Sequence, residues 1–540
     1  MDDTFPSGFK FLQAGGQRVK PYDAFDQAAV ALLADLPAWR LRAIERVELS
    51  SAFWSLRDRE IHTRPLADIL ATHHDLRSKL VPHRTSADTF ELILPIAELP
   101  KIPLLDLTIT IDGEPVYRVA KDESARIEAR YVIQLASEAH LMKDEFAFHP
   151  EVVQHFIDFL AALFYFPAHP YEEVWKKYHR LSFKDADSWL VSYFADEQHE
   201  YLSLRWRHFF LYRYPQWQPI AEQISEVAKT YVVSDYLSGA ENPLIALPYL
   251  IQEIKEEARS SERVMTLHDI DAMLGYLGDL IGRAHRAAQR GDAAARKFIS
   301  AYFAYGYRWM AFAKCKVPVD RPFIIEMKER RAIYFSAKRK PRYSPNELRK
   351  KEACQMVAFA DAETNHVSIR VADTAVRMMH CPKVFDESLN EVTGGVDEEA
   401  STFELYLRQD SSRIRPERIY IKCPLRLTRL HSAMLWLTMF VTALGIFLLW
   451  NRGLSSVGVA PPHDPTVQET PLVAEGLTAK DATLILVPVA FAASFLLIRD
   501  TSTLSAWIRR VRQSVLLIEL LALLGTAFVL LWIHHIRIGG

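Results

Sequence analysis

The sequence is poor in cysteine and glycine, and both shortages exclude classes of protein. Four cysteines occur in 540 residues, with no C-x-x-C pair and no regular histidine spacing, so we expect neither a disulfide framework nor a zinc site. The 19 glycines form no G-x-x-x-x-G-K-[ST] loop and no G-x-G-x-x-G after a strand, which argues against a glycine-rich nucleotide loop. We therefore assign no catalytic residue, no metal ligand and no cofactor. Whether the chain is an enzyme stays open, because catalytic groups can come from distant loops.

The chain also lacks an excess of either charge and an apolar run in its first residues. Its formal net charge is −2, which argues against a nucleic-acid partner, and its 49% hydrophobic content is typical of a folded protein. The first residues, MDDTFPSGFKFLQAGGQ, are acidic and contain no apolar run. We therefore expect no export signal ahead of the C-terminal region, and free cysteines suit a reducing compartment.

Long apolar runs occur only near the C-terminal end. Residues 433–450 and 482–498 carry no charge, and residues 515–533 carry one, Glu519. Each run approaches the ~20 residues that a bilayer span needs. The sequence therefore predicts a three-helix α transmembrane domain over residues 431–540. The alternative, three buried core helices, would need more soluble sequence to cover them than follows these runs.

Basic residues flank these runs unevenly, and the asymmetry predicts an orientation. The loop between the first two runs has only Arg452 and Lys480. The flank before the first run and the loop between the last two are richer in basic residues: Arg413, Arg415, Arg418, Lys422, Arg426 and Arg429, then Arg499, Arg509, Arg510 and Arg512. Because Lys and Arg stay on the cytoplasmic side, we expect a multi-pass protein of the cell membrane with its N-terminal region cytoplasmic and its C-terminus outside.

The region before the membrane domain changes its periodicity twice. Alternating strand patterns dominate residues 1–122 and 321–430, and a helical period dominates residues 123–320. We therefore predict an α+β soluble region in which two β-sandwich-like modules surround a helical module. How the two β-rich modules pack is left open.

Three details of the strands are specific enough to test. Asp112 and Gly113 supply a hairpin turn, and the segment ACQMVAFADAETNHVSIRVADTAVRM is typical of a hairpin of its own. Ile419, Ile421, Cys423 and Leu425 alternate on one face of the last strand. Only residues 428–432 separate that strand from the first apolar run, so the second β-rich module should lie against the cytoplasmic leaflet.

Three segments resemble a group of uncharacterised bacterial membrane proteins. They are LPIAELPKIPLLDLTITIDGEPVYRVAKDESARIEARYV, FADAETNHVSIRVAD and VPVAFAASFLLIRDTSTLSAWIRRVRQSVLLIELLALLG, about a fifth of the chain. Members of that family have a large soluble N-terminal region and three C-terminal transmembrane helices. The resemblance implies this architecture and supplies no activity.

A basic segment near the membrane domain is the main candidate binding site. Basic side chains close to an anionic leaflet contribute about 1 kcal/mol each. The candidates for binding lipid headgroups or a partner are Lys338, Arg339, Lys340, Arg342, Arg349, Lys350 and Lys351. A solvated loop between strands is the alternative.

Glu519 is the intramembrane polar candidate, either in a proton or cation pathway or in an interfacial or structural contact. The sequence favours an integral membrane protein whose cytoplasmic region binds, scaffolds or regulates. Its partners would be the lipid bilayer, anionic headgroups, a second copy of the chain or a cytosolic protein. The alternatives are a transporter or channel component, or a membrane-anchored enzyme with its site in the helical module.

Overall fold

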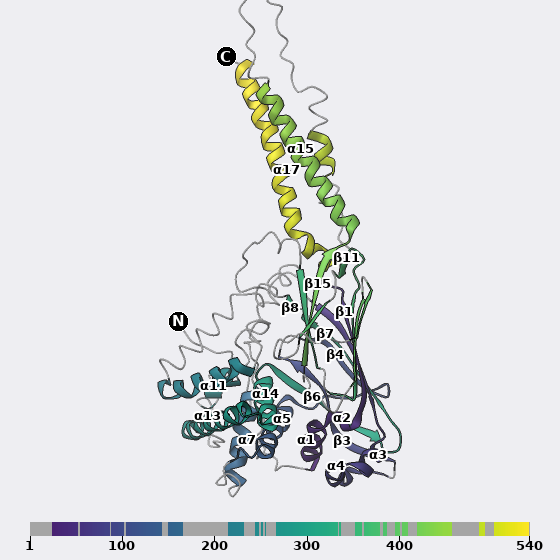
Figure 1. Ribbon diagram of the computed structural model, residues 1–540, viewed down its shortest axis with the longest axis vertical. Coiled ribbons are helices and arrows are strands. Elements are labelled where there is room, and N and C mark those ends of the chain that lie inside the picture. Colours follow the sequence, from purple (N-terminus) through teal and green to yellow (C-terminus); the bar gives the residue numbers. More distant parts are fainter. Residues whose placement is uncertain are drawn as a thin grey trace, which may run out of the picture.

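A strand-rich body, a helical side and a projecting pair of long helices make up the protein (Figure 1). The computed structural model describes residues 24–51, 54–86, 88–101, 104–142, 150–165, 214–231, 243–247, 250–251, 254, 266–332, 334–335, 351–358, 361–378, 382–385, 395–399, 402–408, 418–455, 485–491 and 502–538. Within these residues the protein combines α-helices with a mixed β-sheet, which confirms the α+β class.

The helical side forms around a large apolar core. Its helices are α5 (Lys121–Glu138), α7 (Pro150–Tyr165), α11 (Gln218–Tyr231), α13 (Leu267–Gln289) and α14 (Ala293–Tyr307), with short 3-10 turns η4 (Pro215–Trp217) and η5 (Pro243–Ala246). Pro150 occupies the first turn of α7, where a missing backbone N–H costs nothing. Thr266 and Asp269 form a capping box that starts α13. Buried side chains such as Phe159, Leu277 and Tyr302 join these helices into one core.

A mixed sheet holds the strand-rich side together. Among the described residues its strand order is β13-β14-β10-β1-β2-β7-β4-β5. The strands are β1 (Arg40–Leu49), β2 (Trp54–Thr63), β4 (Leu104–Ile111), β5 (Glu114–Pro115), β7 (Ile324–Ala332), β10 (Thr364–Val371), β13 (Gly395–Glu399) and β14 (Thr402–Arg408). β1 pairs in parallel with β10, from Arg42 opposite Thr364 to Leu49 opposite Val371. Both left-handed residues expected of the β4–β5 turn are present, Asp112 and Gly113, which confirms that hairpin.

Two smaller sheets flank the mixed sheet. β3 (Thr89–Pro100) and β6 (Arg308–Pro318) form a long antiparallel ribbon, whose one face packs on the helical core and whose other face packs on helices at the base. Those helices are α1 (Ala24–Ala34), α2 (Leu36–Trp39), α3 (Leu66–Thr72) and α4 (His74–Leu80), followed by the 3-10 turn η2 (Val81–His83). The third sheet contains β8 (Tyr334–Phe335), β9 (Lys351–Ala358), β11 (Val376–Met378), β12 (Lys383–Phe385) and β15 (Arg418–Leu427).

The strand pairing answers one open question and corrects one prediction. The two β-rich regions, whose packing was left open, share one sheet, because β1 and β2 from the first are hydrogen-bonded to β10 and β7 from the second. The expected hairpin over ACQMVAFADAETNHVSIRVADTAVRM is wrong, because β9 and β11 pair with β15 while β10 pairs with β1 and β14. In both cases a long-range partner replaces the sequence neighbour. The alternation in β15 is confirmed, with Ile419, Ile421, Cys423 and Leu425 all fully buried.

Two long helices, α15 (Arg429–Ser455) and α17 (Thr503–Ile538), pack on each other and project from the body (Figure 1). Within α15, residues 432–451 are long and apolar enough to cross a membrane, and 28% of the most apolar window is buried. In α17 the apolar stretch is shorter, residues 513–529. Of the middle predicted span, 482–498, only residues 485–491 are described, and they are helical. The three-helix transmembrane domain therefore stays a prediction.

Candidate functional site

The buried face of the mixed sheet carries a belt of charged side chains between two apolar cores. Apolar residues occupy both ends of that face, with Ile61 and Ile325 toward the base and Val47 and Ile369 toward α15 and α17. Between them lie side chains that are each at least nine-tenths buried, which we call the buried ion chain: Arg40, Glu45, Arg57, Arg59, Glu329, Arg331 and Asp361. Alternate residues of each strand share a face of the sheet, and so do residues directly opposite each other on paired strands. Glu45 lies opposite Arg59 and Arg57 lies opposite Glu329, so these charges gather on the buried face.

Shared carboxylates connect the members of this chain. Glu45 accepts a hydrogen bond from Arg57 Nη1 at 2.7 Å on Oε1 and from Arg59 Nη1 at 3.1 Å on Oε2. Asp361 Oδ2 accepts from Arg59 and, at 2.9 Å, from Arg40 Nη1. Arg40 Nη2 also donates to the carbonyl oxygens of Pro95 and Ile96 on the ribbon, at 2.5 and 3.2 Å. The chain therefore links the β3–β6 ribbon to the centre of the mixed sheet.

Burial and partner charges set the protonation of these arginines. Loss of hydration lowers the pKa of Arg40 to about 10, against the opposing effect of Asp361. For Arg59 burial also disfavours the charge, but Asp361, Glu45 and Glu329 outweigh it and raise the pKa. Arg40 and Arg59 therefore stay charged near neutral pH, and the carboxylates of Asp361 and Glu45 are needed to compensate these buried cations.

Arg40 and Asp361 also line a cavity of about 300 Å³, which we call the junction cavity. It lies where the helical side meets the ribbon and the start of β1. Asp35 and Lys297 supply charged groups to its lining, and Lys297 Nζ donates to the carbonyl oxygen of Ala34 at 3.3 Å. Its apolar walls are Leu33, Leu36, Ala97, Tyr131, Ala301, Tyr305 and Met310.

Two further buried ionisable side chains, Glu128 and Lys101, lie directly behind the cavity wall. The Met310 N–H donates to Glu128 Oε1 at 2.5 Å, and Lys101 Nζ donates to the carbonyl oxygen of Tyr305 at 2.7 Å. Burial raises the pKa of Glu128 to about 8 and lowers that of Lys101 to about 7. Both groups therefore change protonation near neutral pH, although neither lines the cavity.

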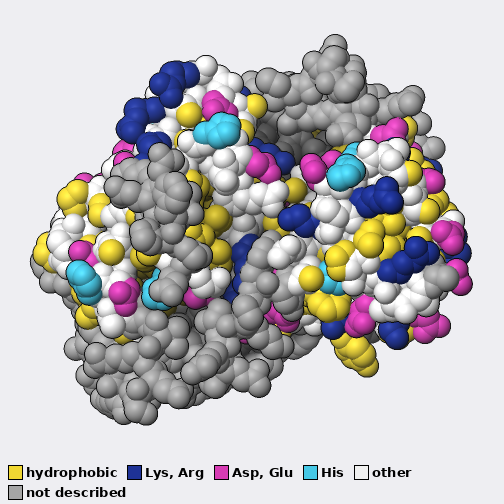
Figure 2. Space-filling model, turned by 90° about the horizontal axis from the view of Figure 1, so that it is seen from below, with side chains coloured by type: hydrophobic (Ala, Val, Ile, Leu, Met, Phe, Trp, Pro, Cys, Tyr) yellow, Lys and Arg dark blue, Asp and Glu magenta, His cyan; other side chains and the backbone are white. Residues whose placement is uncertain are grey.

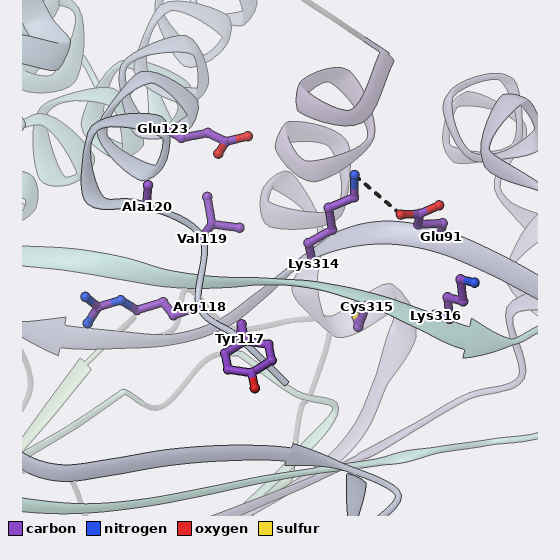
Figure 3. A pocket seen from close by; sticks show the side chains of 9 residues that line it. All are labelled: Glu91, Tyr117, Arg118, Val119, Ala120, Glu123, Lys314, Cys315 and Lys316. Carbon is purple, nitrogen blue, oxygen red and sulfur yellow. Dashed lines mark ion pairs between the residues drawn. The ribbon is translucent and has the colours of Figure 1, made fainter. Parts of the chain in front are cut away.

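A more open pocket of about 510 Å³ lies at the start of α5 and carries mixed charges. Figure 3 shows Lys314 turned toward Glu91, with Nζ 3.4 Å from Oε1, and Cys315 pointing to the other side of β6. Arg118 lies 4.7 Å above the ring of Trp309. Seen from the end opposite α15 and α17, basic side chains lie in a furrow between the two halves of the body (Figure 2). Lys314 and Arg118 have these neighbouring partners, and the junction cavity has the more deeply buried polar wall.

The residues predicted from sequence lie elsewhere. The basic candidates from Lys338 to Lys350 fall outside the described residues. Lys351 is the first residue of β9, opposite Leu425 of β15, and its side chain lies outside the description. Glu519 lies on α17. Among the residues that the structure describes, no three His, Cys, Asp or Glu side chains are placed to hold a metal ion.

Sequence reasoning missed the junction cavity because its polar members are far apart in the chain, Arg40 and Asp361 being 321 residues apart. The one sign in the sequence is the charged residues that interrupt the β1 and β2 patterns at inward-facing positions. Comparisons of the chain with family models, with curated proteins and with solved structures found no match. The site therefore has to be interpreted from its own geometry.

Proposed function

We propose that this chain is an integral membrane protein with a regulatory α+β body. The body binds a ligand at the junction cavity, and this binding acts on the membrane helices. The membrane assignment in this proposal is based on the projecting pair of helices, α15 and α17. On α15 the large apolar side chains Trp436, Leu437, Phe440 and Phe447 are all more than half exposed. Burying such a surface in lipid is favourable, and leaving it in water is not.

Neither a core helix of a soluble protein nor a signal sequence fits α15 well. A core helix of a soluble protein would be mostly buried, whereas only 28% of the apolar window of α15 is buried. A signal sequence would lie near the N-terminus, whereas α15 starts at Arg429. Basic residues around its start favour an orientation with the body on the cytoplasmic side.

Direct packing of the helices on the sheets supports a regulatory role. Leu435 of α15 and Leu504 and Ile508 of α17 belong to the same apolar core as Val47 of β1 and Ile369 of β10. Asp373, just after β10, accepts at Oδ2 from the Ser502 hydroxyl and from the Ser505 N–H at 3.2 Å, next to the start of α17. The strands that hold the buried ion chain therefore also hold the membrane helices.

The basic segment supplies a further part of this proposal. We keep Lys338, Arg339, Lys340, Arg342, Arg349, Lys350 and Lys351 as candidates for anionic headgroups or a cytosolic partner. β15 ends at Leu427 and α15 begins at Arg429, which supports a body held against the leaflet.

Membrane insertion is tested by alkaline carbonate extraction of membranes that contain the full chain. We expect the wild-type chain to stay in the membrane pellet. The double variant Leu437→Arg, Phe440→Arg should be extracted, because each arginine costs about 3 kcal/mol at the centre of a span. Leu41→Arg is the matched control, since Leu41 is 44% exposed but lies on β1 of the body. A wild-type chain released by carbonate would overturn the membrane assignment.

Orientation is tested with single cysteines introduced at Ser336, Ser455 and Gly540, in a background without the four native cysteines. A membrane-impermeant reagent applied to intact cells should label positions 455 and 540 and leave position 336 unlabelled. Labelling at position 336 alone would reverse the orientation and place the body outside the cytoplasm.

A further inference from the structure

The junction cavity has the size and lining of a site for a small molecule. Its volume of about 300 Å³ lies at the low end of ligand pockets, which run from ~300 to ~1,000 Å³. The rings of Tyr131 and Tyr305 and the side chains of Leu33, Leu36 and Met310 form apolar walls. Aromatic walls favour a flat ligand, because planar groups stack on their faces. These features indicate a compact ligand with a planar apolar body.

An incompletely satisfied carboxylate belongs to the polar part of the cavity lining. The Asp361 side chain is 10% exposed, and its Oδ2 already accepts from Arg40 and Arg59. Its Oδ1 is shielded from solvent and has no hydrogen-bond partner among the described residues. A buried acceptor without a partner costs ~1–3 kcal/mol. Because rotation about the bond to an Asp carboxylate is soft, a small rotation can turn Oδ1 toward a donor in the cavity.

The charges around the cavity disfavour ligands of either sign. The lining holds three carboxylates, Asp35, Glu98 and Asp361, against two cations, Arg40 and Lys297, so an added carboxylate or phosphate would increase an excess of negative charge. An ammonium at Asp361 would be repelled, because two arginines already share that carboxylate. A neutral N–H or O–H donor satisfies Oδ1 without adding charge to a buried site.

We propose that the junction cavity binds a small uncharged molecule with a planar apolar body and an N–H or O–H donor that hydrogen-bonds to Asp361. This proposal names the ligand class of the site described under the proposed function. It rests on the proposed function only for the effect of binding on the membrane helices. The binding itself does not depend on how the helices meet the membrane.

The ligand class is tested with four matched probes titrated into the full chain in lipid nanodiscs, with empty nanodiscs as the blank. Benzamide is planar, neutral and carries an N–H donor, while methyl benzoate lacks the donor. Benzoate and benzylammonium add a negative and a positive charge. By calorimetry we expect saturable binding of benzamide, with a Kd at least about tenfold below that of each other probe. Equal or tighter binding of any of the other three, or binding of none, would overturn the proposal.

A cavity-filling variant locates the binding. Ala301 is buried on α14 and lines the cavity, so Ala301→Leu should abolish benzamide binding while the fold is kept. Ala293→Leu adds the same volume at an exposed position of the same helix and should bind benzamide as the wild type does. Benzamide binding unchanged in Ala301→Leu would place the site elsewhere and overturn the proposal. Carbonate extraction of the same samples reports separately on the membrane assignment.

Discussion

At the scale of single residues, Glu128 is the group whose charge state most directly connects pH with stability. Its pKa is raised from 4.5 to about 8 by burial. Between these values the folded state binds a proton that the unfolded state lacks, so the free energy of unfolding falls as pH rises from 4.5 to 8. Glu128→Gln keeps the shape without the charge and should remove this loss. We expect the variant to match the wild type at pH 5 and to exceed it in thermal stability at pH 8.5.

The measurement is the difference in Tm between Glu128→Gln and the wild type across pH 5 to 9. Lys101 acts in the opposite direction, because its lowered pKa of about 7 makes its contribution to stability rise with pH above that value. Glu128→Gln also removes the carboxylate charge that raises the pKa of Lys101, so the difference reports the pair. Glu123→Gln, at an exposed position of α5, is the control and should give a flat difference. A flat difference for Glu128→Gln would show that Glu128 is already ionised in the folded protein.

At the scale of the strands, we expect a Glu→Gln substitution to have very different effects on stability on the two faces of the β1–β2 pair. On the buried face Glu45 compensates Arg57 and Arg59, so Glu45→Gln leaves buried guanidinium groups short of negative charge and should cost ~3–5 kcal/mol. On the other face Glu60 pairs with Arg46, which is half exposed, so Glu60→Gln should cost at most ~1 kcal/mol.

Urea unfolding followed by tryptophan fluorescence measures this contrast, since Trp39 and Trp309 lie in the body. The midpoint for Glu45→Gln should fall well below those of Glu60→Gln and the wild type. Similar midpoints for the two variants would mean that the buried ion chain does not stabilise the sheet.

Individual elements were more predictable than their partners. Alternation identified β15 and its buried face, and Asp112-Gly113 identified the β4–β5 turn, because both depend on neighbouring residues. The parallel pairing of β1 with β10 joins segments more than 300 residues apart, and no local pattern carries that information. The cavity escaped prediction for the same reason. In addition, Glu45 and Arg59 are buried only because each compensates the other.

At the scale of the whole molecule, the proposed regulation requires the body to move as one unit with α15 and α17, the proposed membrane helices. Asp373 supplies one polar contact between them, since its Oδ1 accepts from the Ala375 N–H at 2.8 Å while Oδ2 accepts from groups at the start of α17. Asp373→Ala removes these acceptors next to a helix N-terminus, a loss typically worth ~1 kcal/mol. We expect the variant to stay in the membrane but to loosen locally.

Amide hydrogen exchange in nanodiscs measures that loosening. A loss of ~1 kcal/mol raises local opening about fivefold, so exchange should accelerate at residues 503–506 and at Ala375. Asp320→Ala, at an exposed bend between β6 and β7, should leave those amides unchanged. If benzamide slows exchange at residues 503–506 in the wild type but not in Asp373→Ala, occupancy of the cavity is transmitted through this contact. If exchange at residues 503–506 is the same with and without benzamide in the wild type, the cavity and the membrane helices are energetically independent. The regulatory part of the proposal then fails even where binding and insertion both hold.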